Sequence, residues 1–233
     1  FHSMLLDGKH QLAQGLYLTN PSEGQYSANI TQLGDESTSN YNGLLLSVQR
    51  RRTKGVTVQA NYTWSHTIDD VVGFFKDYQN ENDAQAERAS SDQDVRHNFT
   101  MDASYDLGLR RWFDNGPSQL IDGWQITTTI QGRSGLPVTV TSTGGIFSGF
   151  SNRPNVVPGV NQYCQPYDVP NCQFNAAAFT APAPGAFGNA GRNILRGPGF
   201  AQVDASLIKS TKLSENTSLQ LRLDVFNLFN RAN

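Results

Sequence analysis

The sequence predicts an all-β fold: an antiparallel up-and-down transmembrane β-barrel segment, which would form an open curved sheet if isolated. Two observations carry this prediction. Several segments alternate apolar with polar side chains, and the connections between them alternate between short and long. A membrane-spanning β-strand needs roughly 9–11 residues, with apolar side chains toward lipid, polar ones inside and aromatic ones at the headgroups. No stretch approaches a transmembrane helix, which needs about 18 consecutive apolar residues.

The segment 56–65 shows the alternation most clearly. Successive side chains of a strand point to opposite faces of a sheet, so this segment has one apolar and one uncharged polar face. The apolar face ends in an aromatic pair, Tyr62 and Trp64. Its members are Val56, Val58, Ala60, Tyr62 and Trp64, and the opposite face holds Thr57, Gln59, Asn61, Thr63 and Ser65.

Further segments repeat this period-two pattern and are expected to pair sequentially in one antiparallel sheet. They are 41–50, 97–107, 124–133, 201–209 and 218–229. Their shared phase predicts a common convex, lipid-facing side that carries Val58, Tyr62, Phe99, Tyr105, Ile126, Leu221 and Leu223. The opposite faces include charged residues, which suit a wet interior better than a dry sandwich core: Asp102, Arg133, Arg222 and Asp224.

The connections indicate which side of a membrane each would occupy. Short turns on one side and long loops on the other are the usual layout of an outer-membrane barrel. We therefore expect turns 51–55, 108–123 and 211–217 to be periplasmic, and loops 66–96 and 136–200 to be extracellular. Loops longer than roughly 12–15 residues are uncommon in compact domains and tend to be functional.

Residues 1–40 alternate poorly, and we interpret them as an upstream strand end followed by an extracellular loop. Residues 41–233 are interpreted as part of a barrel with about six strands. The chain opens at Phe1 without a signal peptide, so we expect further sequence upstream. The net charge of −2 gives no sign of a nucleic-acid partner.

The two cysteines, Cys164 and Cys172, lie close together in the longest loop. In an oxidising compartment such a pair favours a disulfide that pins the loop. A metal-binding pair is the alternative, but a metal site needs more ligands, and no histidine or further cysteine lies nearby in sequence. We favour the disulfide and expect no metal site.

The segment 66–97 is the most charged part of the chain. It is either a cation or ligand site at a barrel mouth or a solvated loop, and the absence of EF-hand spacing favours the solvated loop. His66 and His97 flank this segment, and with Asp69 or Asp94 they could form a triad-like group. No Gly-x-Ser-x-Gly elbow accompanies them, so we expect a structural role, no catalytic residue and no enzyme.

The glycine-rich segment 185–192 precedes no predicted helix, so it is not a phosphate-binding loop, and we expect no cofactor. Arg192 and Arg196 lie at its end and just beyond it. They either contact a ligand or tie the loop to the barrel rim, and we favour the second interpretation.

Several short motifs follow one another in a characteristic order. They are Tyr41-Asn42-Gly43-Leu44, Gln49-Arg50-Arg51, Ala60-Asn61-Tyr62-Thr63-Trp64-Ser65-His66, Asp94-Val95-Arg96-His97, Gly123-Trp124-Gln125-Ile126, Ser134-Gly135-Leu136-Pro137, Gly188-Asn189-Ala190-Gly191-Arg192-Asn193 and Phe226-Asn227-Leu228-Phe229-Asn230. Together they resemble the C-terminal barrel of TonB-dependent outer-membrane receptors, specifically the Oar-like type with a carboxypeptidase-regulatory-like N-terminal domain. The resemblance covers residues 40–233.

The resemblance implies a barrel of about 22 strands with a plug inside, in the outer membrane of a bacterium. Substrate uptake would be driven by the inner-membrane TonB complex. On this interpretation the chain is a barrel fragment, and its partners are outer-membrane lipid, its own plug domain, TonB and an unidentified transported ligand. Two alternatives remain: a small structural outer-membrane barrel or adhesin, which needs extra strands from residues 1–40, and a soluble β-sandwich carbohydrate-binding module, which needs a second packed sheet.

Overall fold

The computed structural model describes residues 3–6, 9–12, 37–70, 79–80, 83–142, 152–164, 172–183 and 186–232. Most of the regular structure within these ranges belongs to long antiparallel strands. They are β3 (Ser39–Thr53), β4 (Val56–Asp69), β6 (His97–Leu107), β7 (Trp124–Arg133), β12 (Phe200–Lys212) and β13 (Ser218–Val225). No helix in this described part of the chain is long and apolar enough to cross a membrane.

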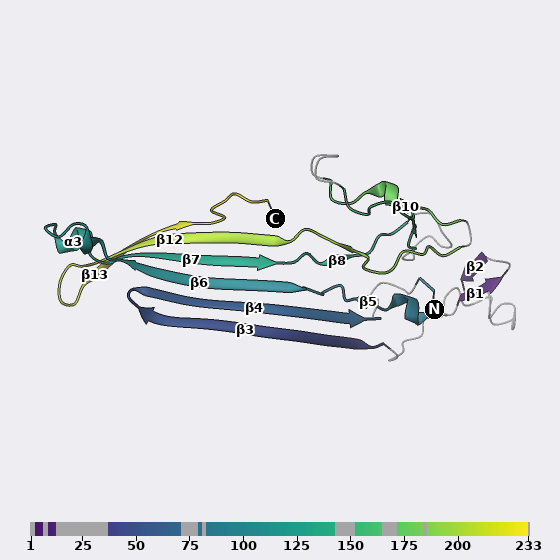
Figure 1. The fold of residues 1–233 in the computed structure, drawn as a ribbon, viewed down its shortest axis with the longest axis horizontal. Helices are drawn as coiled ribbons and strands as arrows, with labels where there is room; N and C mark the ends of the chain where they lie inside the picture. Colours follow the sequence, from purple (N-terminus) through teal and green to yellow (C-terminus); the bar gives the residue numbers. More distant parts are fainter. Residues whose placement is uncertain are drawn as a thin grey trace, which may run out of the picture. The chain divides into compact units, whose positions relative to one another are not determined.

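The long strands form one sheet in the order β13-β12-β7-β6-β4-β3. Figure 1 shows β3, β4, β6, β7 and β12 lying side by side. Every long strand pairs with its neighbour in sequence, which confirms the predicted up-and-down antiparallel sheet. Among the described residues no strand pairs with the outer edge of β3 or β13, so the sheet is open.

The register confirms that the predicted apolar residues share one face. Tyr62 lies opposite Phe99, Tyr105 lies opposite Ile126, and Leu207 lies opposite both Ile126 and Leu223. Strand side chains alternate between faces, so these matched pairs place one apolar row after another on the same side. The opposite side carries mostly polar residues, with Phe200 opposite Arg133 and Ile208 opposite Gln125 as apolar exceptions.

The apolar face remains open, and few side chains are buried beneath the sheet. Leu221 is 61% exposed, Leu223 is 63% exposed and Tyr105 is 44% exposed. Within the described ranges the buried apolar residues are Ile121, Ala178, Ala190 and Leu195, and none of them lies on a long strand. An exposed apolar face of this kind needs a nonaqueous partner, because soluble monomers rarely leave such surfaces uncovered.

The first turn is shorter than predicted. We expected a turn over 51–55, but β3 continues to Thr53, and only Lys54 and Gly55 connect it to β4. Both have positive φ, 53° and 82°, which is the conformation of a two-residue turn whose twist matches that of the flanking strands. Gly55 meets this requirement without strain, because it has no Cβ.

The last strand also ends earlier than predicted. We expected it to reach 229, but β13 stops at Val225. Asn227 and Asn230 adopt left-handed backbone conformations with φ of 49° and 48°. The amide of Leu228 donates to the carbonyl of Val203 at 2.8 Å, so the chain still contacts β12 beyond the end of β13. Asparagine tolerates the left-handed region better than other residues with a side chain, which accounts for these conformations.

The connection 108–123 contains two short helical turns, η2 (Leu109–Arg111) and α3 (Ser118–Ile121). Arg110 Nε donates to Asp122 Oδ1 at 3.0 Å, across the ends of this connection. The hydrogen bond from Arg110 holds the pKa of the Asp122 carboxyl below its usual value. The connection is therefore a folded cap on the sheet end at which β6 meets β7.

Both long segments leave the sheet at the opposite end. Trp64 pairs with His97, Asn98 pairs with Arg133, and Arg133 pairs with Phe200, so these strand termini lie level with one another. This agrees with the predicted alternation of short and long connections. The assignment of these ends to the periplasm and the exterior stays a prediction.

The chain divides into a sheet unit and a loop unit. The sheet unit comprises 43–65, 95–135 and 198–233, and the loop unit comprises 1–42, 66–94 and 136–197. The loop unit contains mostly short elements: β1 (Ser3–Leu6), β2 (Lys9–Leu12), η1 (Ala84–Glu87), β5 (Ala89–Ser90), β8 (Pro137–Val138), β9 (Asn155–Val156), η3 (Ala176–Ala178), β10 (Phe179–Thr180) and β11 (Leu195–Arg196). β1 pairs with β2, and residues 13–36 lie outside the described ranges, so the predicted loop at 1–40 is described only in part.

Candidate functional site

Charged residues from the two long segments meet inside the loop unit around Arg192, which is only 6% exposed. Its guanidinium donates to the carboxylate of Asp69 and, at 2.7 Å, to the backbone carbonyl of the same residue. It also donates to the carbonyl of Glu87 at 2.8 Å and lies 3.4 Å from Asp92 Oδ1. One side chain therefore joins the end of β4 to the segment that follows η1.

A second buried ion pair joins Glu87 to Arg153. Arg153 Nη1 donates to Glu87 Oε2 at 2.6 Å, and the two residues are 4% and 1% exposed. Gln79 completes the contact: its amide donates to Glu87 Oε1 at 3.0 Å, and its Oε1 accepts the amide of Arg153 at 2.9 Å. A buried charge needs both an opposite charge and further hydrogen bonds, and Glu87 has both.

Gly188 lies against this pair. Its carbonyl accepts a hydrogen bond from Gln79 Nε2 at 2.8 Å. A Cβ at this position would collide with the backbone carbonyl oxygens of Arg153 and Pro154. The glycine-rich segment is therefore required for close backbone approach here, which differs from a phosphate-binding role.

Asp94 is the third buried acid of the loop unit and is 1% exposed. It accepts hydrogen bonds from the Thr67 amide at 2.8 Å and from the guanidinium of Arg196, and it lies 3.3 Å from His66 Nδ1. Burial by itself raises the pKa of Asp94, but the Thr67 amide, Arg196 and His66 together hold that pKa below its usual value. Asp94 is therefore a carboxylate at neutral pH.

Asn193 completes the cluster beside Arg192. It has a φ of 54°, and its Nδ2 donates to the Ser90 carbonyl at 2.8 Å and to Asp92 Oδ1 at 2.6 Å. Thr139 donates to Asn193 Oδ1 at 2.8 Å and accepts the Asn193 amide at 3.0 Å. The segment 188–193 thus links the 66–94 segment to Thr139 through one short run of residues.

The two histidines have separate partners. His66 contacts Asp94, a pairing that the sequence analysis considered as part of a triad-like group. His97 Nδ1 instead lies 2.8 Å from the hydroxyl of Tyr62. The rings of His97 and Tyr62 are stacked with centroids 6.1 Å apart. His97 therefore belongs to the strand end, and His66 belongs to the buried loop cluster.

Cys164 and Cys172 are bonded to each other, with Cα atoms 5.8 Å apart. Next to them Tyr163 bridges Phe174, and the hydroxyl of Tyr163 accepts the amide of Arg196 at 2.9 Å. The bond therefore lies beside the Tyr163–Phe174 bridge, and the Tyr163 hydroxyl joins this part of the loop unit to β11. Whether the pair is oxidised in the cell stays a prediction.

Sequence reasoning found some members of this loop cluster. It favoured Arg192 and Arg196 as residues that tie the loop to the barrel rim, and in the structure they pair with two carboxylates of the 66–94 segment, Asp69 and Asp94. It missed the contact between Glu87 and Arg153, whose only signal is the presence of opposite charges in the two long loops. It favoured a solvated loop for 66–97, whereas the structure buries three of its acids, because distant arginines neutralise them: Asp69, Glu87 and Asp94.

The chemistry of the loop cluster is that of a charge-balanced support. Each buried carboxylate faces a guanidinium, so the cluster holds backbone segments together. Within the described ranges no group of three or more histidine, cysteine, aspartate or glutamate side chains is placed to hold a metal ion.

Comparison with curated proteins and with solved structures found no match. A family model described as an outer membrane beta barrel domain matches residues 8–233. The open antiparallel sheet, its single apolar face and its polar opposite face agree with that description. The chain therefore belongs to the outer membrane beta barrel domain family.

Proposed function

We propose that the chain forms part of the barrel wall of a TonB-dependent receptor, which takes up a substrate across the bacterial outer membrane. Membership of the barrel family supports the membrane location. The ordered motifs that resemble Oar-like receptors support the TonB-dependent type. In this proposal the partners of the chain are lipid on one face and, on the other, a plug domain that TonB acts on and a transported ligand.

The observation that carries the proposal is a row of carboxylates on the polar face. Asp102 and Asp204 lie on either side of Thr129 in the register of β6, β7 and β12. Thr129 donates to Asp102 at 2.8 Å, while Asp204 accepts from Gln202 at 2.9 Å. No arginine or lysine among the described residues forms an ion pair with either carboxylate. Such a face needs water, which a wide barrel supplies.

The same observation weighs against a small structural barrel. A barrel of about eight strands has an interior that side chains fill, so these carboxylates would be buried there without counter-ions. A wide barrel requires more strands than this sheet contains, and the outer edges of β3 and β13 offer the backbone groups for pairing with them.

In vivo crosslinking to TonB tests this proposal. Antibody against the chain should recover from outer membranes a protein crosslinked to TonB, and the crosslinked species should disappear in a strain without TonB. Intact mass and peptide coverage of the recovered protein should reveal a plug domain. A protein with the mass of a small barrel, without a plug and without a TonB crosslink, would contradict the proposal and favour the structural barrel.

A further inference from the structure

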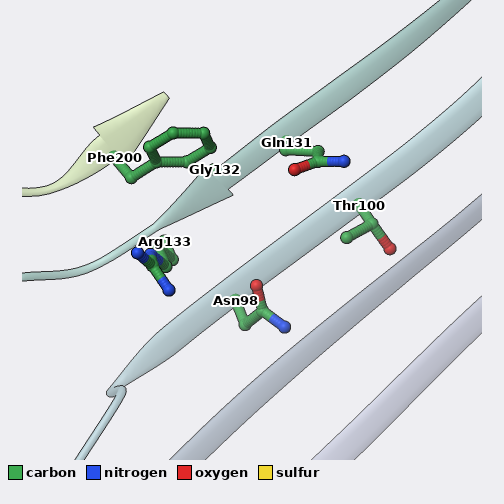
Figure 2. A pocket seen from close by; sticks show the side chains of 6 residues that line it. All are labelled: Asn98, Thr100, Gln131, Gly132, Arg133 and Phe200. Carbon is green, nitrogen blue, oxygen red and sulfur yellow. The ribbon is translucent and has the colours of Figure 1, made fainter. Parts of the chain in front are cut away.

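The polar face of the sheet has a hollow of about 270 Å³ at the end where the long segments leave. Figure 2 shows the side chains around it, which come from β6, β7 and the first residue of β12. The lining residues are Asn98, Thr100, Gln131, Gly132, Arg133 and Phe200. Ligand pockets for drug-sized molecules measure about 300–1,000 Å³, so this hollow suits a single ring or a single amino-acid residue.

Arg133 gives the hollow its charge. Its guanidinium lies over the ring of Phe200, 5.3 Å from the ring centroid. Within the described ranges no carboxylate lies within ion-pair distance of Arg133. Arginine stays protonated and presents a planar fork of N–H donors, which remains available at its edge when an aromatic ring covers one face.

The neutral side chains around Arg133 also have hydrogen-bonding capacity to spare. Asn98 lies directly opposite Arg133, and Thr100 lies opposite Gln131. The side chains of these three neutral residues form no hydrogen bond with any other described residue. The hollow therefore combines one positive charge, two amides, a hydroxyl and an aromatic surface.

We propose that this hollow binds a ligand through its carboxylate group. The Arg133 fork donates two parallel hydrogen bonds to the carboxylate, and Asn98 and Gln131 donate to the remaining oxygen lone pairs. Phe200 covers the apolar side of the ligand. One guanidinium balances one negative charge, so a carboxylate fits better than a phosphate, which carries more charge than a single arginine neutralises.

The proposal rests on the proposed function, because it takes the polar face to be the water-filled interior. Two sources supply a carboxylate of the right size: a sugar acid and the free C-terminus of a short peptide. Calorimetric titration of the protein, purified from outer membranes in detergent micelles, separates them. The probes are D-galacturonate and a free N-acetyl dipeptide, with D-galactose, the dipeptide amide and inorganic phosphate as controls.

We expect one of the two acids to bind saturably and its uncharged counterpart not to bind. Arg133→Gln should weaken binding of that acid about 10- to 100-fold, because charge-assisted hydrogen bonds are lost. Arg133→Lys keeps the positive charge but lacks the planar fork of donors. Its affinity for the acid should lie between that of the unsubstituted chain and that of Arg133→Gln. The matched control is Arg222→Gln, which removes an arginine from the polar face of β13. Arg222 is paired with Asp224, so this substitution should leave binding of the acid unchanged.

Absence of binding by both acids, binding of phosphate as tight as that of the acid, or an unchanged affinity in Arg133→Gln overturns the carboxylate site. Each variant should migrate differently on a gel before and after heating, as the unsubstituted protein does, which shows that its barrel is folded. The titration needs neither TonB nor energy, so its failure leaves the TonB crosslink untouched. Loss of the TonB crosslink with carboxylate binding retained would overturn the proposed function alone.

Discussion

Replacing Arg192 with leucine should open the loop cluster while the sheet stays folded. The substitution removes the donors to the Asp69 carboxylate, the Asp69 carbonyl and the Glu87 carbonyl. Asp69 is 7% exposed, so its charge would remain where water reaches it poorly. Both the lost hydrogen bonds and the uncompensated charge act on the same backbone segments.

The magnitude follows from the burial of the pair. Removing one partner of a buried ion pair costs about 3–5 kcal/mol. The Asp69 side chain keeps 10% exposure, so partial hydration reduces the cost, and we expect about 3 kcal/mol. This corresponds to roughly a 100-fold increase in the population of the open loop cluster.

Hydrogen–deuterium exchange measured by mass spectrometry reads this population directly. Amides in 66–70 and 186–196 should exchange about 100-fold faster in Arg192→Leu, while the strand amides keep their protection. Arg110→Leu is the matched control, because its partner Asp122 is 48% exposed and the pair should contribute little to stability.

A change in exchange of less than about threefold in Arg192→Leu, or one equal to that of the control, would refute this reasoning. The double substitution Arg192→Leu with Asp69→Leu gives an independent check. Removing both charges should restore much of the lost protection, because replacing a whole buried pair with apolar side chains costs little.

Further predictions concern the same loop unit. Gly188→Ala should destabilise it by about 1–3 kcal/mol, because the added methyl group collides with backbone carbonyls, whereas Gly191→Ala, with nothing within 4 Å, should have no effect on exchange. The pKa of Asp94 lies below 3.8 in the folded chain, so its contacts stabilise the loops above that pH, and amide protection should fall as the pH drops further. Non-reducing peptide mapping should recover Cys164 and Cys172 in one crosslinked fragment; two free thiols would contradict the disulfide, worth about 2–3 kcal/mol by loop closure.

The sequence was sufficient to predict the strands that alternate strictly. The ranges 97–107 and 124–133 agree with β6 and β7 at both ends, because each position faces either an apolar or a polar environment. Alternation does not reveal where a strand ends in polar residues, so the extension of β3 to Thr53 was missed. The end of β13 was overestimated, because a left-handed asparagine leaves no mark on hydrophobic periodicity.

The loop cluster was harder to predict, for a physical reason. The pairing of Glu87 with Arg153 depends on two loops meeting in space, and no periodic pattern encodes that meeting. The high charge of 66–97 was interpreted as that of a solvated loop, and Arg192, at the end of the glycine-rich segment 185–192, was interpreted as a tie to the barrel rim. The hollow beside Arg133 was also not predicted, because Phe200 precedes the segment in which alternation was recognised.

The central claim is that one face of the sheet meets lipid and the other meets water. Single cysteines along β7 in native outer membranes, reacted with a small charged thiol reagent, test it most directly, with the unsubstituted chain as background. We expect labelling with a period of two: strong at Thr127, Thr129 and Gln131, and weak at Ile126, Thr128 and Ile130. Uniform labelling of both sets, or stronger labelling of the second set, would contradict the account.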